Sequence, residues 1–454
     1  MSILLITPPF TQLNTPYPAT AYLQGFLNTK GIPAEQMDLG IEVILELFTQ
    51  RRLAEVFARS TSSVEPRSQV QGDGWSSNAR RILALQREYL ATIEPVIRFL
   101  QGKQPTLARQ IASENFLPQA SRFDNLAELD LAFGNMGHQD KAKHLATLYL
   151  EDLSDFIVET LDPHFGFSRY AERLGRSANS FDELHAALQQ PLSYIDELTV
   201  ELLQSHITYP QSHTAYPLAC FSVPFPGNLF SAFRCAQWLK ANRPEIKTVM
   251  GGGFPNTELR SVSDPRVFDY FDYITLDDGE LPLELLWQHT TASPRQASET
   301  TTLPPEKPLF KRTFHLEDGQ VLYNDFSLQR DYRMSEIGTP DYTGLPLDRY
   351  ISVIEIANPM HSLWSDGRWN KLTMAHGCYW GKCTFCDVSL DYIGNYKPVN
   401  ASLLVDRMEE MMAQTGENGF HFVDEAAPPA LMRDLALEII RRELRVSWWT
   451  NIRF

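Results

Sequence analysis

The sequence predicts an α/β protein in which a Rossmann-like parallel sheet, interrupted by a large helical insertion, is followed by part of a β/α barrel. Three observations support this fold class. Short apolar segments alternate with amphipathic helical segments on both sides of the insertion. Residues from about 44 to 205 have helical periodicity almost throughout. A second series of strand and helix segments, about thirty residues per unit, begins at residue 371.

The first half of the Rossmann-like sheet is predicted within residues 1–49. Residues 3–6 form a short apolar run that two prolines end, as expected for a buried parallel strand. A helix is predicted over residues 19–30, and Gly31 follows it in the position where glycine commonly ends a helix. A weaker strand comes next. The order strand, helix, strand is typical of the start of a doubly wound sheet.

The insertion spans residues 50–214, and the sheet resumes over residues 215–295. Apolar side chains recur at helical spacing over residues 79–100 and 144–161 of the insertion. His138 and His144 lie in a charged stretch of it and are expected on a solvated face. After the insertion, strands are predicted at 218–223, 246–250 and 270–276, with helices at 228–242 and 281–289.

A connecting segment over residues 296–370 separates this sheet from the partial barrel, which is predicted over residues 371–454. The connecting segment is rich in proline and irregular. In the barrel region, a strand begins at Lys371 and leads into a cysteine cluster. The later segments are predicted as helices at 402–415 and 431–443 and as strands at 419–423 and from 445 onward.

The composition excludes several classes of protein. Glycine and proline together number 53 of 454 residues, which rules out collagen-like and low-complexity chains. The net charge of −16 argues against a broad surface for nucleic acid or anionic membranes. The chain has no apolar run of membrane-spanning length and no signal-like start. We therefore expect a soluble, cytoplasmic protein.

Three of the five cysteines lie in the stretch HGCYWGKCTFCD, where Cys378, Cys383 and Cys386 are spaced C-x4-C-x2-C directly after a predicted strand. This is a poor disulfide framework and a good metal site. Three thiolates cannot complete a tetrahedral zinc site alone, but a [4Fe–4S] cluster held by them leaves one iron open. The alternative is zinc, with His376 or Asp387 as fourth ligand. The remaining two, Cys220 and Cys235, are interpreted as core residues.

The cysteine stretch resembles the signature of the radical S-adenosylmethionine superfamily. As in that family, an aromatic residue, Phe385, precedes the last cysteine, and the loop follows the first barrel strand. The second barrel strand ends in the acidic residues Asp424 and Glu425. One departure is that the first gap between cysteines is four residues rather than the usual three.

The resemblance implies a chemistry for these residues. S-adenosylmethionine would chelate the open iron, and one electron from the reduced cluster would cleave it to methionine and a 5′-deoxyadenosyl radical. Phe385 would pack beside the adenine, and Asp424 or Glu425 would accept the methionine ammonium group. The alternative for Asp424 is a helix N-cap. Asn451 and Arg453, on the third strand, are candidates to face the same cavity. A flavodoxin or ferredoxin would supply the electron.

The N-terminal sheet is similar to the cobalamin-binding domain that is fused to many radical S-adenosylmethionine enzymes. Its cofactor-binding candidates are the residues at the ends of neighbouring strands: Ser222, Gly251, Gly252, Gly253, Asp278, Gly279 and Glu280. The glycine run would let the backbone approach a bulky ligand. The chain has no Asp-x-His-x-x-Gly motif, so no histidine is placed to ligate cobalt. The alternatives are an ordinary tight turn and a domain that keeps its shape without cobalamin.

The function predicted from these resemblances is a radical S-adenosylmethionine enzyme that uses a [4Fe–4S] cluster and, as a second expectation, cobalamin. Methyl transfer to an unactivated carbon, or another radical reaction, is expected on a small-molecule or peptide substrate. The alternative function is a non-catalytic metal-binding module. Residues 371–454 hold fewer strand–helix units than the family's barrel, which has about six. We therefore expect a truncated chain with weak or no turnover and an apolar sheet edge at Val446–Trp449.

Overall fold

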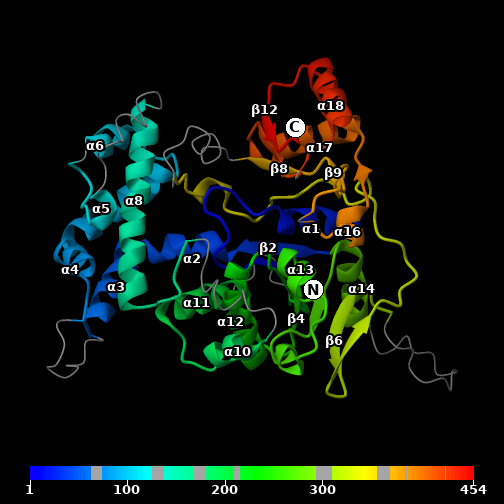
Figure 1. Ribbon diagram of the computed structural model, residues 1–454, viewed down its shortest axis with the longest axis horizontal. Coiled ribbons are helices and arrows are strands. Elements are labelled where there is room, and N and C mark those ends of the chain that lie inside the picture. Colours follow the sequence, from blue (N-terminus) through cyan, green and yellow to red (C-terminus); the bar gives the residue numbers. More distant parts are fainter. Residues whose placement is uncertain are drawn as a thin grey trace.

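The computed structural model describes residues 1–62, 74–113, 115–124, 137–167, 180–208, 215–292, 309–354, 369–384, 386–424 and 426–453. It confirms an α/β protein with a mostly parallel central sheet and many helices (Figure 1). In the part of the chain that is described, no helix is long and apolar enough to cross a membrane.

The central sheet has seven strands in the order β2-β1-β3-β4-β5-β6-β7. The pairs from β2 to β5 are parallel, whereas β6 and β7 form an antiparallel hairpin against β5. That hairpin belongs to the segment predicted as an irregular connection, so the sheet is wider than expected. The strands are β1 (Ile3–Thr7), β2 (Ala34–Asp38), β3 (Leu218–Ser222), β4 (Lys247–Gly251), β5 (Tyr273–Thr275), β6 (Thr313–Glu317) and β7 (Gln320–Asn324).

Both faces of the sheet are covered, which explains why β1 and β3 are apolar and buried along their whole length. In β1, Ile3 and Leu5 belong to the core under α1 and α14, and Leu4 and Ile6 belong to the core on the other face. The helices around the sheet are α1 (Pro18–Thr29), α2 (Leu39–Leu47), α10 (Asp182–Leu188), α11 (Tyr194–Thr208), α12 (Pro226–Asn242), α13 (Gly253–Glu258) and α14 (Glu280–Thr291).

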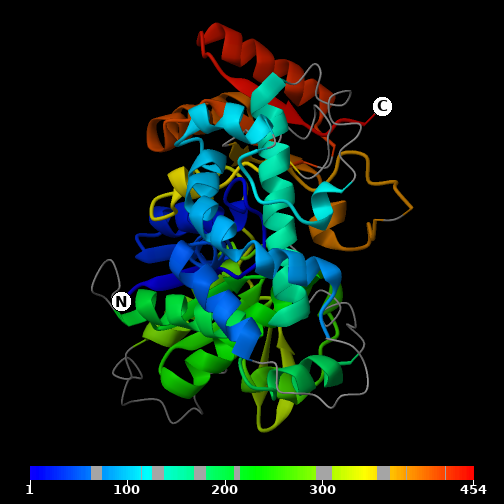
Figure 2. The same ribbon diagram turned by 90° about the vertical axis from the view of Figure 1, so that its left-hand side faces the viewer.

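Most of the described helices of the insertion stand together at one side of the sheet (Figures 1 and 2). This group comprises α3 (Gln50–Ser62), α4 (Ser77–Ala84), α5 (Gln86–Leu100), α6 (Ala108–Ala112) and α8 (Gly137–Thr160), whereas α10 and α11, which also belong to residues 50–214, pack beside α12. His138 is exposed as expected, but the expectation for His144 was wrong. His144 is buried, and its Nδ1 lies 2.8 Å from the carbonyl oxygen of Ile354. The insertion thus binds the end of the segment that precedes the C-terminal sheet.

The C-terminal region contains three parallel strands in the order β12-β11-β8, namely β12 (Ser447–Thr450), β11 (Gly419–Phe422) and β8 (Asn370–Leu372). Helices α17 (Ala401–Thr415) and α18 (Pro429–Arg441) pack on one face through the core side chains Leu372, Phe420, Phe422, Leu404, Met408 and Leu435. Strand β12 lies at one edge of these three strands, with Trp448 and Trp449 half-buried.

Short elements complete the C-terminal region and the connections. Strand β9 (Ala375–His376) pairs with β10 (Lys397–Pro398), and α16 (Asp391–Gly394) lies between them in sequence. The 3₁₀ helices are η1 (Pro105–Leu107), η2 (Ser121–Phe123), η3 (Pro265–Asp269) and η5 (Leu347–Arg349). Strand β9 and helix α16 lie on the side of the C-terminal sheet that faces α1 (Figure 1).

Candidate functional site

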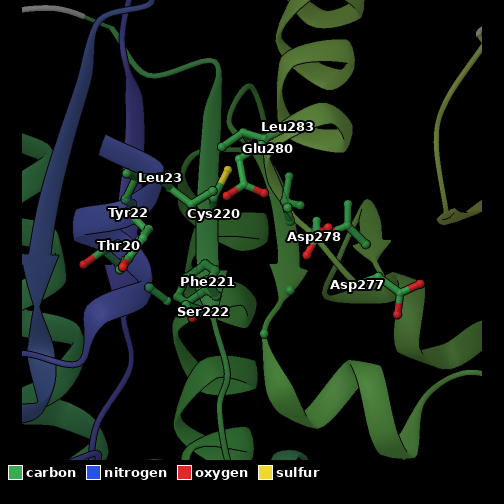
Figure 3. A pocket seen from close by; sticks show the side chains of 17 residues that line it. Thr20, Tyr22, Leu23, Cys220, Phe221, Ser222, Asp277, Asp278, Glu280 and Leu283 are labelled. Carbon is green, nitrogen blue, oxygen red and sulfur yellow. The ribbon is translucent and has the colours of Figure 1, made fainter. Parts of the chain in front are cut away.

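A cavity of about 250 Å³ opens at the carboxyl ends of β1, β3, β4 and β5. This edge of a parallel sheet is where α/β folds usually bind ligands. One part of the wall is apolar, and a second part carries hydroxyl and carboxyl groups (Figure 3). The lining residues are Leu5, Ala19, Thr20, Tyr22, Leu23, Cys220, Phe221, Ser222, Val249, Gly251, Gly252, Thr275, Asp277, Asp278, Gly279, Glu280 and Leu283.

The cavity has an acidic side. The side chains of Asp278 and Glu280 lie across it from Thr20 and Tyr22, which come from α1 (Figure 3). Burial, reinforced by the charge of Asp278, raises the pKa of Glu280 to about 7. Burial also raises the pKa of Asp278, although the charges of His376 and Arg312 oppose this. The cavity therefore disfavours a further anion and offers a protonated carboxyl group near neutral pH.

We expect this carboxyl group to make stability depend on pH. A glutamate in the unfolded chain releases its proton near pH 4.3. The folded chain holds the proton of Glu280 to about pH 7. Because the folded state binds the extra proton between these values, the unfolding free energy should fall as pH rises through this window, by up to about 3 kcal/mol.

Urea unfolding of the wild type and the Glu280→Gln variant at several pH values between 4.5 and 8 measures this contribution. Because glutamine cannot titrate, the unfolding free energy of the variant should decrease much less than that of the wild type as the pH rises. The exposed Glu258 on α13 provides a control, and Glu258→Gln should keep the wild-type profile. Equal pH profiles for wild type and Glu280→Gln would contradict the expectation.

The glycine run at the end of β4 lies at the same edge. Gly251 and Gly252 line the cavity, whereas Gly253 begins α13 and does not. Gly252 has φ +107°, and a Cβ atom there would lie 2.8 Å from the backbone nitrogen and oxygen of Val223. The amide of Val223 donates to the carbonyl oxygen of Gly251 at 2.8 Å. The close approach of two neighbouring chain segments therefore explains why Gly252 has no side chain.

Arginine side chains hold the acidic loop after β5. Asp277 has φ +60° and pairs with Arg260. The guanidinium of Arg312 donates to the carbonyl oxygens of Leu276 and Asp278 at 3.2 and 3.0 Å. It also forms two hydrogen bonds to the carboxylate of Asp331, at 2.9 and 2.7 Å. The backbone of this loop at Leu276 and Asp278 is thus held by an arginine side chain that directly precedes β6, outside the loop.

The start of the cysteine loop lies at the mouth of this cavity. His376 ends β9 two residues before the first cysteine, and its Nε2 lies 3.3 Å from Oδ1 of Asp278. The hydroxyl oxygen of Tyr22, from the cavity wall, accepts the backbone N–H of Thr373 at 2.8 Å. Two contacts therefore join the N-terminal sheet to the strand that leads into Cys378. Sequence periodicity gave no signal for either of them.

Asp424 supports the same strand from the other side. Its side chain is 7% exposed, and its two oxygens accept the backbone N–H groups of Met374 and Ala375 at 2.7 and 2.9 Å. The N-cap alternative for this residue was wrong, because α18 begins after Pro428. Asp424 instead holds the last residues before the cysteine loop in place.

Among the described residues none of the three cysteines forms a disulfide, and each is partly exposed. Nη1 of Arg453 lies 3.1 Å from Sγ of Cys383, and its guanidinium stacks 4.1 Å above the ring of Trp380. Arg453, which follows the end of β12, therefore contacts the cysteine loop. Within the described ranges, no group of three His, Cys, Asp or Glu side chains is arranged to hold a metal ion.

The remaining candidates are distributed as follows. Phe385 and Glu425 lie outside the described residues. Asn451 is exposed, and its carbonyl oxygen accepts the N–H of Ala427 at 2.9 Å. Ser222 and Gly279 line the cavity as expected. The sequence analysis missed Thr20 and Tyr22, which only the packing of α1 against the strand ends reveals.

The chain matches no protein-family model, no curated protein and no solved structure.

Proposed function

We propose that this chain is a radical S-adenosylmethionine protein in which the cysteine loop and the cavity of the N-terminal sheet form one site. The observation that carries the proposal is the contact between His376 and Asp278. It places a loop with three closely spaced cysteines at the mouth of a cavity at the carboxyl ends of parallel strands. Ligand chemistry is common at this position in α/β folds.

The chemistry of the donor set fits a [4Fe–4S] cluster with one open iron. Cys378, Cys383 and Cys386 are three thiols on one partly exposed loop. The guanidinium of Arg453 lies beside one of these candidate ligands, with Nη1 3.1 Å from Sγ of Cys383. When bound and reduced, the cluster would supply one electron for the cleavage of S-adenosylmethionine.

The other residues would position this loop. Asp424 fixes the backbone at Met374 and Ala375, so its oxygens serve the strand end rather than standing free for a methionine ammonium group. Arg453 and Trp380 form a stacked pair that covers one side of Cys383. We propose that the three strands β8, β11 and β12 are the first part of a β/α barrel around this site.

The cavity fits part of a cobalamin molecule. Its volume of about 250 Å³ accommodates a heterocycle with a sugar, whereas a corrin macrocycle is larger and would have to lie over the mouth, beside His376. No histidine lies among the described residues that line the cavity. In this proposal the N-terminal domain is Rossmann-like and binds only the base and sugar of the cofactor's nucleotide tail in the cavity, with the phosphate outside, away from the carboxyl groups of Asp278 and Glu280.

Anaerobic reconstitution tests the proposal. We expect about four iron and four sulfide per chain, and reductive cleavage of S-adenosylmethionine to 5′-deoxyadenosine with dithionite or reduced flavodoxin. The Cys383→Ala variant should lose the cluster absorbance and reduce cleavage to background. Cys235→Ala, which removes a thiol from the buried core of α12, should keep both.

Three other results would contradict parts of the proposal. Bound zinc without iron uptake would favour a non-catalytic metal-binding module. A cluster that forms but never cleaves S-adenosylmethionine would exclude radical chemistry in this chain. The absence of a corrinoid spectrum after incubation with hydroxocobalamin would exclude only the cobalamin part of the proposal.

A further inference from the structure

A row of three side chains crosses the C-terminal sheet on the face that α17 and α18 do not cover. Strand pairing places His421 directly opposite both Lys371 and Trp449. The adjacent positions Leu372, Phe420 and Phe422 belong to the core beneath the two helices. Because successive side chains of a strand point to opposite faces, the row of Lys371, His421 and Trp449 lies on the other face. In a β/α barrel that face is the interior.

The three side chains are in contact. Nζ of Lys371 lies 2.9 Å from Nδ1 of His421, and the imidazole stacks on the indole of Trp449 with ring centres 3.7 Å apart and an interplanar angle of 10°. Lys371 is 3% exposed. The indole Nε1 of Trp449 is buried and has no hydrogen-bond partner within the described part of the chain.

The electrostatics of this row are unusual for a purely structural contact. No carboxylate of the described residues forms an ion pair with Lys371, and its amine faces an imidazole instead. Burial lowers the pKa of Lys371 to about 7. Burial and the charge of Lys371 lower the pKa of His421 to about 3. An apolar pair of similar volume would cost less to bury, so stability alone does not explain an amine here.

We propose that Lys371 is a carbonyl-capturing residue, which binds an aldehyde or ketone ligand as an imine on the inner face of this sheet. The Nζ lone pair would attack the carbonyl carbon and form the C=N bond, while the carbonyl oxygen takes up two protons and leaves as water. No oxidant or reductant is consumed. His421 would orient the amine through Nδ1, and the unpaired N–H of Trp449 is available to bind the carbonyl oxygen.

This inference goes beyond the proposed function and does not depend on it. It rests on the strand register and on the Lys371–His421 contact, neither of which requires a cluster, S-adenosylmethionine or cobalamin. A failure to reconstitute iron would leave it standing, and a failure to form an imine would leave the cluster proposal standing.

Reductive trapping of the full chain, without added iron, tests the proposal. The protein is incubated at pH 7 with propanal and cyanoborohydride, and propylation of each lysine is quantified by peptide mass spectrometry. About half of an amine with a pKa of about 7 is neutral at that pH, compared with about 1 in 2,500 for an ordinary lysine. We expect Lys371 to be modified at least tenfold faster than the exposed Lys397 on β10.

Two variants separate the roles of the row. His421→Phe keeps an aromatic ring to stack on Trp449 but removes Nδ1, and it should slow the labelling of Lys371 several-fold while Lys397 is unaffected. Lys371→Met should abolish the rapid propylation at this position, and its far-UV circular dichroism spectrum should match that of the wild type. The proposal would be overturned if Lys371 of the folded wild type were labelled no faster than Lys397 while both lysines were labelled equally in urea.

Discussion

Replacing Gly252 with alanine is expected to destabilise the protein by about 3–5 kcal/mol. The residue has φ +107°, which L-amino acids with a side chain rarely adopt. The new Cβ would also lie 2.8 Å from the nitrogen and the oxygen of Val223. Both atoms belong to backbone, so rotation of a side chain cannot relieve the contact. The end of β4 would have to move away from β3.

Urea unfolding followed by far-UV circular dichroism measures this loss. The control is Gly319→Ala in the turn between β6 and β7, where φ is +77° but no atom lies within 4 Å of the added Cβ. That variant carries the backbone cost alone, about 1 kcal/mol. If the two variants lost the same free energy, the close approach of the Val223 backbone to Gly252 would not be what requires glycine there.

Replacing Asp424 with alanine is the second large effect that we expect. The substitution removes two buried acceptors and leaves the N–H groups of Met374 and Ala375 unpaired. Each unpaired buried donor costs about 1–3 kcal/mol, so the loss should be about 2–5 kcal/mol. The same change frees the strand end before Cys378. Iron uptake on anaerobic reconstitution should therefore fall together with stability.

A matched control is Asp434→Ala on α18, where the carboxylate is 52% exposed and pairs only weakly with its neighbour Arg433. That variant should lose less than about 1 kcal/mol and keep its iron content. An Asp424→Ala chain that unfolds at the wild-type urea concentration would show that the two hydrogen bonds do not hold this strand. Normal iron content in a destabilised variant would show that the strand end does not position the cysteines.

Local pattern was enough to predict most of the central sheet. The apolar runs that became β1, β3 and β4 are continuous because both faces of each strand are buried, and the structure places all three in one parallel sheet. Of the hairpin β6–β7, the sequence indicated only a strand-like piece at residues 320–326 within an irregular segment, because the hairpin is only half-buried and has no strong apolar signal. Its place beside β5 depends on pairing with a strand far away in sequence.

For the candidate site too, some features could be predicted from the sequence and others could not. The spacing of the three cysteines and the loops at the ends of β3, β4 and β5 are visible in the sequence. The partner of each side chain is not. Asp424 was expected to bind a ligand or cap a helix, yet its oxygens accept backbone N–H groups from a strand fifty residues earlier. His144 was expected in solvent, yet it contacts Ile354.

The sequence by itself determined the α/β class, the mostly parallel sheet and the one loop on which three thiols gather. These properties depend on residue spacing within a few turns or strands, which periodicity reports directly. Only the tertiary structure decided that His376 meets Asp278, that Tyr22 supports Thr373 and that Lys371 faces His421. Such contacts join elements distant in the chain, and packing and hydrogen bonding select them only once the sheets have formed.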